Sequence, residues 1–438
     1  MISATGTSRR NVEARVHPWV LALVMIAPLP LGGARPLPEA LFATLTAILL
    51  AAWALGHLRS EHPSPVAMSR LAWVLAPATT VILWLALREH LVDGPPFDYR
   101  AGDAIMHLAT LLGVYLLCVQ CGRSSRLALR AFHLLVLAGA LYAAYGLTMH
   151  LGGFDTVLIW DRWAYRDSVT STFVNRNHYA TYAGMSVILT LAVLLNPTPS
   201  RSRHPAAQRM TLYLERQWPL LGALLLTLMA LLLTESRAGL LSTGVGMAVF
   251  LLLLARTRIP RISRHQLIAV GMVAGLLLAL FGSGTAQRFA VLKISEIDRL
   301  VAAEITAGAI TDAPVVGHGA GRFAEVFARL RDARLPGRES WLHAHNDYLE
   351  LALEWGIPAT LLVIIIILTP AVASARGALK RRHDAALAAA GPACVALCAT
   401  HAIVDFSAQT LGVGMTLAAV LGISYAQSWS KSPATPER

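Results

Sequence analysis

The chain has 438 residues, of which 55% are hydrophobic and only 14% are charged. Soluble domains carry about 25% charged residues, and a water-soluble fold of this length would have to hide too much apolar surface. The composition therefore excludes a soluble enzyme or binding module and indicates a membrane protein with several spans.

Twelve apolar runs are long enough to cross a bilayer as helices, since a hydrocarbon core of about 30 Å needs about 20 mostly apolar residues. The first run lacks a small-residue cleavage site and leads directly into the second, so we expect a retained span and not a signal peptide. The sequence thus predicts an all-α polytopic membrane protein with about 12 transmembrane helices. In chain order the runs cover residues 16–33, 38–57, 71–90, 104–121, 127–150, 177–195, 218–234, 238–256, 265–283, 346–370, 385–403 and 410–428.

The positive charge of the chain lies where membrane topology explains it. The formal net charge is +12. If the N-terminus is cytoplasmic and the spans alternate, most of the 37 basic residues fall in short inner segments, such as 123–130 and 256–264. An excess of Arg and Lys in short cytoplasmic loops is the positive-inside pattern. We therefore expect both termini in the cytoplasm, membrane lipids as surroundings and no nucleic-acid partner.

One outer connection, residues 284–344 between predicted spans 9 and 10, is much longer than the others. Connections of this length are usually functional or disordered. Its segment "KISEIDRLVAAEITAGAI" places apolar residues at helical spacing, which predicts an amphipathic helix lying over the outer membrane face. We expect 284–344 to form a folded cap on a single transmembrane domain that comprises residues 1–438.

Two polar clusters stand at the outer ends of predicted spans. In "STFVNRNHYATYAG", Arg176 and Asn177 enter the sixth span. An Arg at membrane depth costs about 2.5–3.5 kcal/mol, so Arg176 either snorkels to water as an anchor or faces a polar cavity. In "LLLTESRAGLLS", Arg237 stands at the tip between two spans. It either pairs with Glu235 or binds an anion at the start of the next helix, where the partial positive charge of the helix end would reinforce binding.

A third cluster, "DAPVVGHGAGRF" (312–323), is rich in glycine. No strand precedes it and it lacks the Lys of a phosphate-binding P-loop, so a tight glycine turn is favoured over a nucleotide loop. Arg322 at its end remains a candidate ligand contact.

The fourth cluster, "HAHNDYLELALEW", places His345 and Asn346 before a predicted span. Asp347, Glu350 and Glu354 follow at spacings of three and four and therefore share one face of a helix. An acidic face is expensive against lipid, so this face must meet polar protein or water.

Two other roles for outer histidines are less favoured. His343, His345 and Asp347 do not make a convincing metal site, because H-x-H spacing does not place two imidazoles on one helical face, and we expect no metal. His401 and Asp405, four residues apart, form a further outer-facing pair. For this pair a structural cross-link is favoured over a functional role.

Arginines and a histidine on one side of the membrane favour phosphate chemistry. The planar donors of guanidinium groups match phosphate oxygens. A histidine, with a pKa near ~6.5, can accept a proton at neutral pH. A lipid-linked phosphate substrate would fit such a site. Transfer without metal or cofactor becomes possible if arginines neutralise a pyrophosphate leaving group.

These motifs resemble the O-antigen ligase and O-antigen polymerase superfamily of bacterial inner-membrane glycosyltransferases. In the ligases a His is followed by Asn, Ser or Gln, nine residues, Gly, two residues, and Gly, Thr or Tyr. Here His345, Asn346 and Gly356 match, whereas Ala359 departs from the last position. Arg237 precedes a Leu by four residues, as in the family. "VNRNHYA" and "PVVGHGAGRF" are also similar to family segments, and the resemblance covers about residues 165–410.

The resemblance implies the helical fold of C-type glycosyltransferases and transfer of a glycan from undecaprenyl pyrophosphate at the periplasmic face. It implies that His345 activates the acceptor hydroxyl and that Arg237 and Arg176 hold the pyrophosphate. Arg322 and Arg299 are further candidates for donor contacts, and Asn346 and Asn177 are expected to contact substrate. Transfer would be independent of metal and inverting.

Several acceptors stay open from the sequence. A ligase would use a lipid A–core sugar, a polymerase another lipid-linked repeat unit of O-antigen or exopolysaccharide, and a protein O-oligosaccharyltransferase a Ser or Thr hydroxyl; the ligase is favoured. An anionic solute transporter or lipid flippase is the alternative from another class. It is disfavoured because the polar clusters lie at one face only, whereas transporters place broken helices at mid-membrane. A scaffold leaves the acidic face unexplained.

Overall fold

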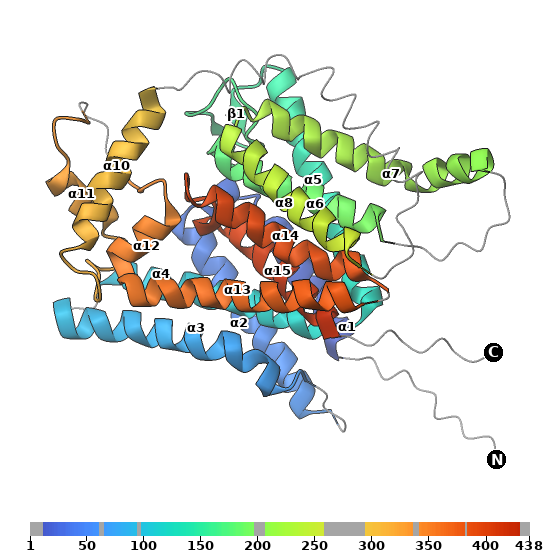
Figure 1. Cartoon of the computed structure of the whole chain (residues 1–438), viewed down its shortest axis with the longest axis horizontal. Coiled ribbons are helices and arrows are strands. Elements are labelled where there is room, and N and C mark those ends of the chain that lie inside the picture. The colour runs from blue at the N-terminus through green and yellow to red at the C-terminus, as the bar shows by residue number, and fades with distance from the viewer. Residues whose placement is uncertain are drawn as a thin grey trace.

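The structure is a computed structural model that describes residues 12–60, 65–93, 98–196, 206–257, 294–335, 341–381 and 383–429. It is a bundle of long helices with one small antiparallel pair of strands, β1 (Thr156–Val157) and β2 (Trp160–Asp161) (Figure 1). The helices are α1 (Val12–Ile26), α2 (Pro36–Leu58), α3 (Met68–Arg88), α4 (Tyr99–Cys121), α5 (Ser125–Leu151), α6 (Arg176–Leu194), α7 (Ala206–Leu233), α8 (Arg237–Ala255), α10 (Ile294–Ile310), α11 (Phe323–Leu330), α12 (Asp347–Trp355), α13 (Ile357–Lys380), α14 (Ala385–His401) and α15 (Leu411–Trp429). Short helical turns cover Leu31–Gly33, Glu89–Asp93 and Ser407–Gln409.

Seven helices in the described part of the chain are long and apolar enough to cross a membrane. Two shorter apolar helices, Gln217–Leu233 and Ala385–His401, accompany them. The prediction of an all-α polytopic membrane protein is confirmed at this level. The predicted span 265–283 lies outside the described residues. The seven helices are Pro36–Leu58, Met68–Val92, Tyr99–Cys121, Ser125–Leu151, Arg237–Ala255, Ile357–Lys380 and Leu411–Trp429.

Helices α6, α14 and α15 form the centre of the bundle, and α2 and α3 lie at its edge. Every residue of α6 from Asn177 to Leu194 is buried, whereas α2 buries only Phe42 and Thr46. The central helices pack on one another and on α4, α5, α7 and α8. A helix buried on all sides can carry Ser, Thr and Asn, because protein rather than lipid surrounds them.

Small residues let the central helices approach closely. Helix α14 begins with a run of alanines, and a side chain on Gly391 would meet the Cβ of Ser424 on α15 at 2.6 Å. The Ser424 hydroxyl instead donates to the carbonyl of Leu387 and accepts from the Gly391 amide. Close backbone packing with short polar side chains as cross-links is typical of helix interfaces in membranes.

The predicted span 346–370 is wrong in its first third, because the helix breaks at Gly356. This residue has φ 83° and ψ 158°, and a Cβ there would lie 2.0 Å from the Val315 carbonyl oxygen. Of the two helices on either side of this break, only α13 (Ile357–Lys380) has the length and composition of a membrane span. The acidic helix α12 is a separate nine-residue element that meets α13 at an angle (Figure 1).

Helices α10, α11 and α12 gather at one end of the bundle, which we call the α12 end (Figure 1). They share a small hydrophobic core of their own, with Phe323, Phe327 and Leu353 at its centre. Helix α10 confirms the amphipathic helix predicted within 284–344. The described part of this connection is therefore folded, and it packs against the start of the "HAHNDYLEL" segment.

Candidate active site

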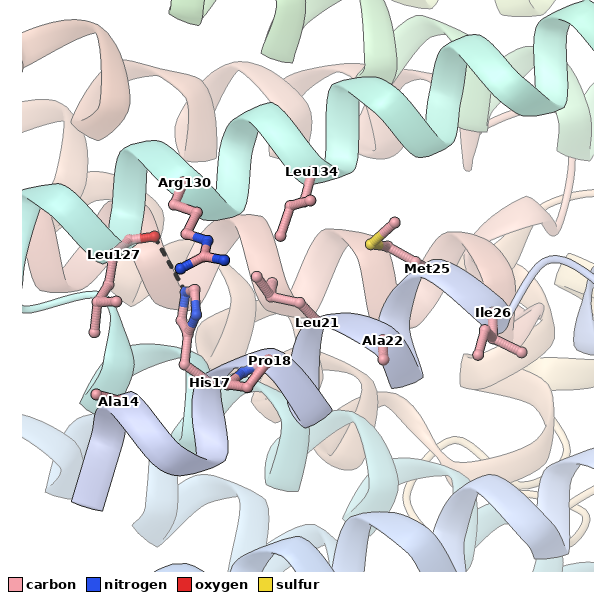
Figure 2. A pocket seen from close by; sticks show the side chains of 10 residues that line it. All are labelled: Ala14, His17, Pro18, Leu21, Ala22, Met25, Ile26, Leu127, Arg130 and Leu134. Atoms are coloured by element: carbon pink, nitrogen blue, oxygen red, sulfur yellow. Dashed lines mark hydrogen bonds between the residues drawn. The ribbon is translucent and has the colours of Figure 1, made fainter. Parts of the chain in front are cut away.

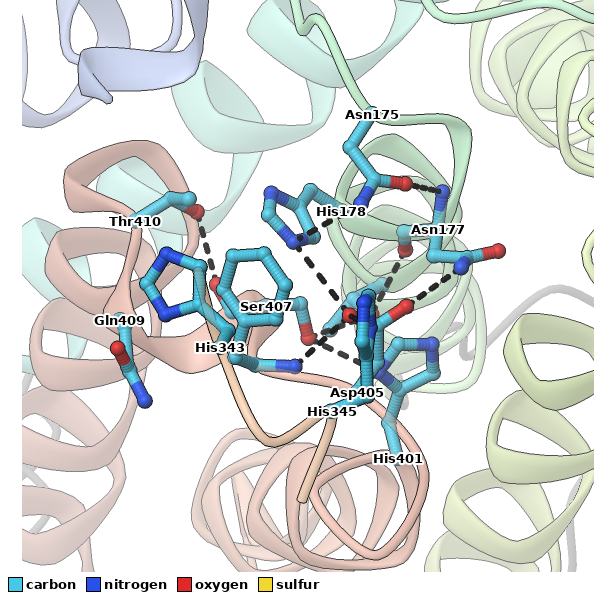
Figure 3. Close-up of polar contacts among 12 residues, drawn as sticks. Asn175, Asn177, His178, His343, His345, His401, Asp405, Ser407, Gln409 and Thr410 are labelled. Atoms are coloured by element: carbon cyan, nitrogen blue, oxygen red, sulfur yellow. Dashed lines mark hydrogen bonds and ion pairs between the residues drawn. The ribbon is translucent and has the colours of Figure 1, made fainter. Parts of the chain in front are cut away.

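Asp405, in the loop between α14 and α15, is the centre of a buried polar network at the α12 end (Figure 3). The side chain is fully buried. One carboxylate oxygen accepts a hydrogen bond from the side-chain amide of Asn177. The other carboxylate oxygen accepts from the backbone amide of Phe406. This second oxygen also lies 3.4 Å from Nδ1 of His345 and 3.7 Å from Nε2 of His178. Burial raises the pKa of Asp405, but the hydrogen bonds with His178 and His345 outweigh it and hold the pKa well below its ordinary value.

The segment before α12 places His345 on this carboxylate. Asn346 caps α12, its side-chain oxygen accepting from the Leu349 amide at 3.0 Å, and its NH₂ group donates to the carbonyl of Ile403 at 2.9 Å. The Asp347 amide donates to the carbonyl of Ala402. His345 itself adopts φ 51°, a conformation that is uncommon outside glycine. The segment His345–Asp347 is thus held against the α14–α15 loop by hydrogen bonds to Ala402 and Ile403. The His345 ring remains partly exposed beside Asp405.

The first turn of α6 supplies the other side of the network. Asn175 caps the helix by accepting from the Asn177 amide at 2.8 Å. The cap fixes the turn in which Asn177 and His178 both face Asp405, and both side chains are buried. The predicted site residues Asn177 and His345, 168 positions apart in the chain, therefore meet on one carboxylate.

Three of the predicted arginines lie around this network. Arg176 donates to the Ser168 hydroxyl at 3.1 Å, lies 3.6 Å from the Glu235 carboxylate and stacks over the Tyr165 ring. Burial and the Asp405 charge raise the pKa of Tyr165, while Arg299 and Arg176 lower it. The charges of all three residues therefore interact electrostatically with the Tyr165 phenol.

Arg299 and Arg237 complete this basic side. Arg299 on α10 reaches across to the carbonyl of Val404, the residue before Asp405, at 3.3 Å. Arg237 is the first residue of α8, directly after the Ser236 cap, and its helix start adjoins the turn at Glu235 that Arg176 contacts. Arg299 therefore contacts the α14–α15 loop directly, while Arg237 begins α8 next to the Glu235 turn.

Arg322 belongs to a different cluster. Its guanidinium lies 3.2 Å from Asp98 and 3.7 Å from the buried carboxylate of Glu89. Gly317, Gly319 and Gly321 all have positive φ, as the predicted glycine turn requires. The turn is tied to the end of α3 and the start of α4, so Arg322 is not brought together with His345.

The acidic face of α12 meets polar protein, as predicted. Glu354 is buried and accepts from the amides of Gly321 and Phe323 at 2.8 and 3.0 Å. Burial, with a further contribution from the Glu350 charge, raises the pKa of Glu354 to about 7. Asp347, whose pKa burial also raises well above its ordinary value, accepts from the Gln409 amide at 2.7 Å. Glu354 therefore anchors the start of α11 and links it to α12.

Glu350 makes a second histidine–carboxylate pair. Its side chain lies 2.8 Å from Nδ1 of His343 and accepts from the Ala344 amide at 2.6 Å. The His343 ring stacks on Phe406, 3.8 Å between centroids, and Phe406 also contacts the His345 ring. Burial lowers the pKa of His343, but the neighbouring Glu350 carboxylate outweighs it and raises the pKa above its ordinary value.

A cavity of about 740 Å³ opens beside His343. Its walls come mainly from α4, α12, α13, α14 and α15, and its lining is mostly apolar. His343, Asp347 and Glu350 line it, but His345, Arg176, Arg237, Arg299 and Arg322 do not. His345 and these four arginines are thus outside the cavity lining, although Arg100 and Gly321, the neighbour of Arg322, belong to it.

A second, smaller cavity of about 380 Å³ lies between α1 and α5 (Figure 2). His17 and Arg130 are its polar residues, and His17 Nε2 lies 3.1 Å from the Leu127 carbonyl. This cavity is at the other end of the bundle from Asp405. Among the residues that the structure describes, no group of three or more His, Cys, Asp or Glu side chains could hold a metal ion.

Two functional candidates were missed by the sequence interpretation. Asp405 was assigned a structural role with His401, yet it contacts His345; His401 instead faces the Ser407 hydroxyl at 3.0 Å. The pairing of His343 with Glu350 was also not foreseen. The sequence marks Asp405 only through its spacing from His401, and no spacing rule ties it to His345, 60 positions earlier.

Comparison with known proteins addresses part of the chain. A family model described as O-antigen ligase matches residues 222–364, which include Arg237, Arg299 and His345. The matched stretch does not include Arg176, Asn177 or Asp405. No curated protein matches the chain. This match supports the O-antigen ligase family and confirms the resemblance recognised from the motifs of the chain.

Proposed function

We propose that the protein is an O-antigen ligase that transfers a glycan from undecaprenyl pyrophosphate to a sugar hydroxyl of lipid A–core at the periplasmic face of the inner membrane. The observation that carries this proposal is the contact between His345, the family-motif histidine, and the buried carboxylate of Asp405. A histidine held by a carboxylate through Nδ1 has Nε2 left to accept a proton.

In the proposed reaction Nε2 of His345 takes the proton of the acceptor hydroxyl as its oxygen attacks the anomeric carbon of the donor glycan. The bond from that carbon to the pyrophosphate oxygen breaks, and the leaving pyrophosphate keeps the electron pair. Asp405 orients the imidazole and stabilises the imidazolium that forms. A single displacement of this kind inverts the anomeric centre.

The arginines of α6, α8 and α10 suit the donor. Arg299 contacts the Asp405 loop, Arg176 lies beside Asn177, and Arg237 begins α8 next to the Glu235 that Arg176 faces; we propose that the three hold the pyrophosphate, which gains charge as it departs. Fixed cations at that position stabilise the transition state without reorganisation. The geometry is compatible with a reaction that needs no metal, because arginines supply the countercharge.

Reconstituted transfer tests the proposal. Purified protein in lipid nanodiscs is given an undecaprenyl-pyrophosphate-linked glycan and lipid A–core, and the joined product is measured by mass spectrometry. We expect product with the wild-type protein and a loss of about 10²- to 10⁴-fold with His345→Ala, because a general base of this kind contributes that much. His133→Ala, an exposed histidine on α5, is the matched control.

The outcome also separates the alternatives. Elongation of lipid-linked repeats in place of attachment to lipid A–core would make the protein a polymerase. Glycan on a Ser or Thr of an added protein would make it an oligosaccharyltransferase. Full transfer by His345→Ala would end the proposed mechanism.

A further inference from the structure

The cavity between α1 and α5 lies between two points at which these helices are joined. At one point Nε2 of His17 lies 3.1 Å from the Leu127 carbonyl, and at the other the Tyr142 hydroxyl donates to the Met25 carbonyl at 2.8 Å. Met25 is eight positions after His17, which is about 12 Å of helix. Two hydrogen bonds thus hold the helices together on either side of a space of about 380 Å³ (Figure 2).

The end of this cavity near His17 suits an anion. Arg130 interacts electrostatically with His17, and Figure 2 shows its guanidinium group beside the His17 ring. Arg130 is exposed, and within the described part of the chain it forms no hydrogen bond or ion pair. No Asp or Glu is among the described residues that line the cavity. Glu13, which precedes the lining residue Ala14, faces His57 of α2 at 3.2 Å. An anion here would therefore meet Arg130 without competition from a carboxylate.

His17 offers a second kind of contact at the same end. A carbonyl oxygen can only accept, so Nε2 of His17 carries the hydrogen that the Leu127 carbonyl accepts. Among the residues that the structure describes, Nδ1 of His17 has no hydrogen-bond partner. In the neutral ring this nitrogen is an acceptor, which suits a hydroxyl group. The polar end can therefore hold a phosphate at Arg130 and a hydroxyl at His17.

The rest of the cavity is apolar and continues as an exposed face of α5. Leu21 and Met25 of α1 and Leu134 of α5 line it. Leu137 and Leu141 follow Leu134 at spacings of three and four and therefore share its face of α5, where they are 50% and 60% exposed. Helix α5 is long and apolar enough to cross a membrane, so this face suits hydrocarbon chains of the bilayer.

We propose that the cavity binds one anionic phospholipid with a hydroxyl-bearing headgroup, as in phosphatidylglycerol, whose phosphate pairs with Arg130 and whose acyl chain covers Leu134. The inference does not rest on the proposed glycan transfer. A zwitterionic headgroup such as that of phosphatidylethanolamine fits less well, because its ammonium group would lie near the Arg130 guanidinium. A lipid bound here would join α1 to α5 between their two hydrogen bonds and stabilise the folded protein by mass action.

Native mass spectrometry of the delipidated full-length protein in detergent tests the polar end. The probes are dioleoyl phosphatidylglycerol and dioleoyl phosphatidylethanolamine, which differ only in their headgroups. We expect one molecule of phosphatidylglycerol to bind about tenfold more tightly than phosphatidylethanolamine. Arg130→Gln should remove this preference, and Arg130→Lys should retain most of it. Arg59→Gln is the matched control and should keep the preference. Arg59 is exposed after α2 at the same end of the bundle, where His57 faces Glu13.

The apolar part is tested by filling it. Ala22→Phe, in the lining, should weaken binding of phosphatidylglycerol by about tenfold. Ala51→Phe, exposed on α2, should leave binding unchanged. Glycerophosphoglycerol, the headgroup without acyl chains, distinguishes a lipid from a soluble anion, and we expect a large molar excess of it not to displace the lipid.

Equal binding of the two lipids would overturn the inference. Equal losses from Arg130→Gln and Arg59→Gln would also overturn it, since they would indicate a diffuse attraction of lipid to positive charge. Equal losses from Ala22→Phe and Ala51→Phe would place the lipid elsewhere, and displacement by glycerophosphoglycerol would make the cavity a site for a soluble anion. His345→Ala should bind the lipid as the wild type does while it loses transfer, so failure of this site and failure of the proposed function are distinguishable.

Discussion

His343 and His345 are separated by a single residue, yet they face different carboxylates in different surroundings. His345 faces Asp405 of the α14–α15 loop, on the side where the arginines of α6, α8 and α10 lie. His343 faces Glu350 of its own following helix, at the mouth of an acid-lined cavity. Both rings contact Phe406: the His343 ring stacks on it, and the His345 ring meets it edge-on.

The difference teaches that neighbouring histidines acquire their chemistry from the element each one meets. Asp405 is shared by three side chains from two other elements, so its charge is fixed in place by the fold. Glu350 is bound to the local segment through His343 and the Ala344 amide, and it accepts one longer hydrogen bond, 3.2 Å, from Gln409 before α15. We expect the Asp405 side, and not the Glu350 side, to govern the chemical step.

The largest expected effect comes from the Asp405 side. Asp405→Asn keeps the size of the side chain but removes the charge that orients and stabilises the His345 imidazolium. We expect kcat to fall by about 10²- to 10⁴-fold, measured as initial rate of glycan transfer at saturating substrates. Asp384→Asn, at the other end of α14 and paired with Arg381, is the control and should keep its rate. A wild-type rate for Asp405→Asn would remove the carboxylate from the mechanism.

The arginines should separate into two classes. Arg176→Ala should raise KM for the undecaprenyl-pyrophosphate donor by about 10- to 100-fold, since a hydrogen bond to a charged group is worth about 1.5–3 kcal/mol. Arg322→Ala should leave donor KM unchanged and lower the thermal midpoint instead, because Glu89 is buried beside it. Donor titrations and thermal unfolding of the same preparations measure both. The opposite pattern would move the donor site to the glycine turn.

A smaller effect is expected from the cavity side. His343→Ala should lower kcat far less than His345→Ala does, because Nδ1 of His343 faces Glu350 and not the Asp405 carboxylate. Acceptor titrations at saturating donor measure the split between KM and kcat. A loss of kcat equal to that of His345→Ala would mean that the two histidines act together in the chemical step.

The smallest effect is a pH-dependent change in stability. Burial raises the pKa of Glu354 to about 7 in the folded protein, above its ordinary value of 4.5. The protonated Glu354 side chain therefore contributes its full stabilisation at pH values below the pKa of the unfolded state. This contribution to the free energy of unfolding is lost as pH rises from about 4.5 through 7. Glu354→Gln should match wild type near pH 5 and unfold at a temperature a few degrees higher near pH 8. Glu304→Gln, exposed on α10, is the control, and an unchanged difference across this pH range would contradict the assignment.

Much of the fold could be predicted because bilayer thickness leaves few choices to an apolar run. The described helices α2 to α6, α8, α14 and α15 lie close to the predicted ranges, whereas α7 (Ala206–Leu233) begins well before the predicted run 218–234. The break at Gly356 had a local signal in "WGIP", a glycine followed by a proline at the second position of the next helix. The family motif crosses this break, so the apolar run and the motif were interpreted as one helix.

Residues of the candidate site could be predicted only where they belong to a recognisable motif or polar cluster. His345, Asn346 and Arg237 belong to recognisable segments, and Arg176 and Asn177 to a polar cluster at a helix start. Their meeting point, Asp405, could not be found, because a carboxylate 60 positions away has no spacing rule that ties it to His345. Arg322 shows the converse, since a residue in a family-like segment lies in another cluster.

The sequence by itself determined that the chain spans a membrane, roughly where its helices run, and that His345 stands in an O-antigen ligase motif. These properties are local, because hydropathy and short motifs act within one turn or one span. Only the tertiary structure decided that His345 faces Asp405 while His343 faces Glu350 and lines a cavity. Each of these pairings depends on which buried charges come together when helices distant in the chain pack. The free energy of such a pair depends on its burial and partners, which exist only once the bundle has formed.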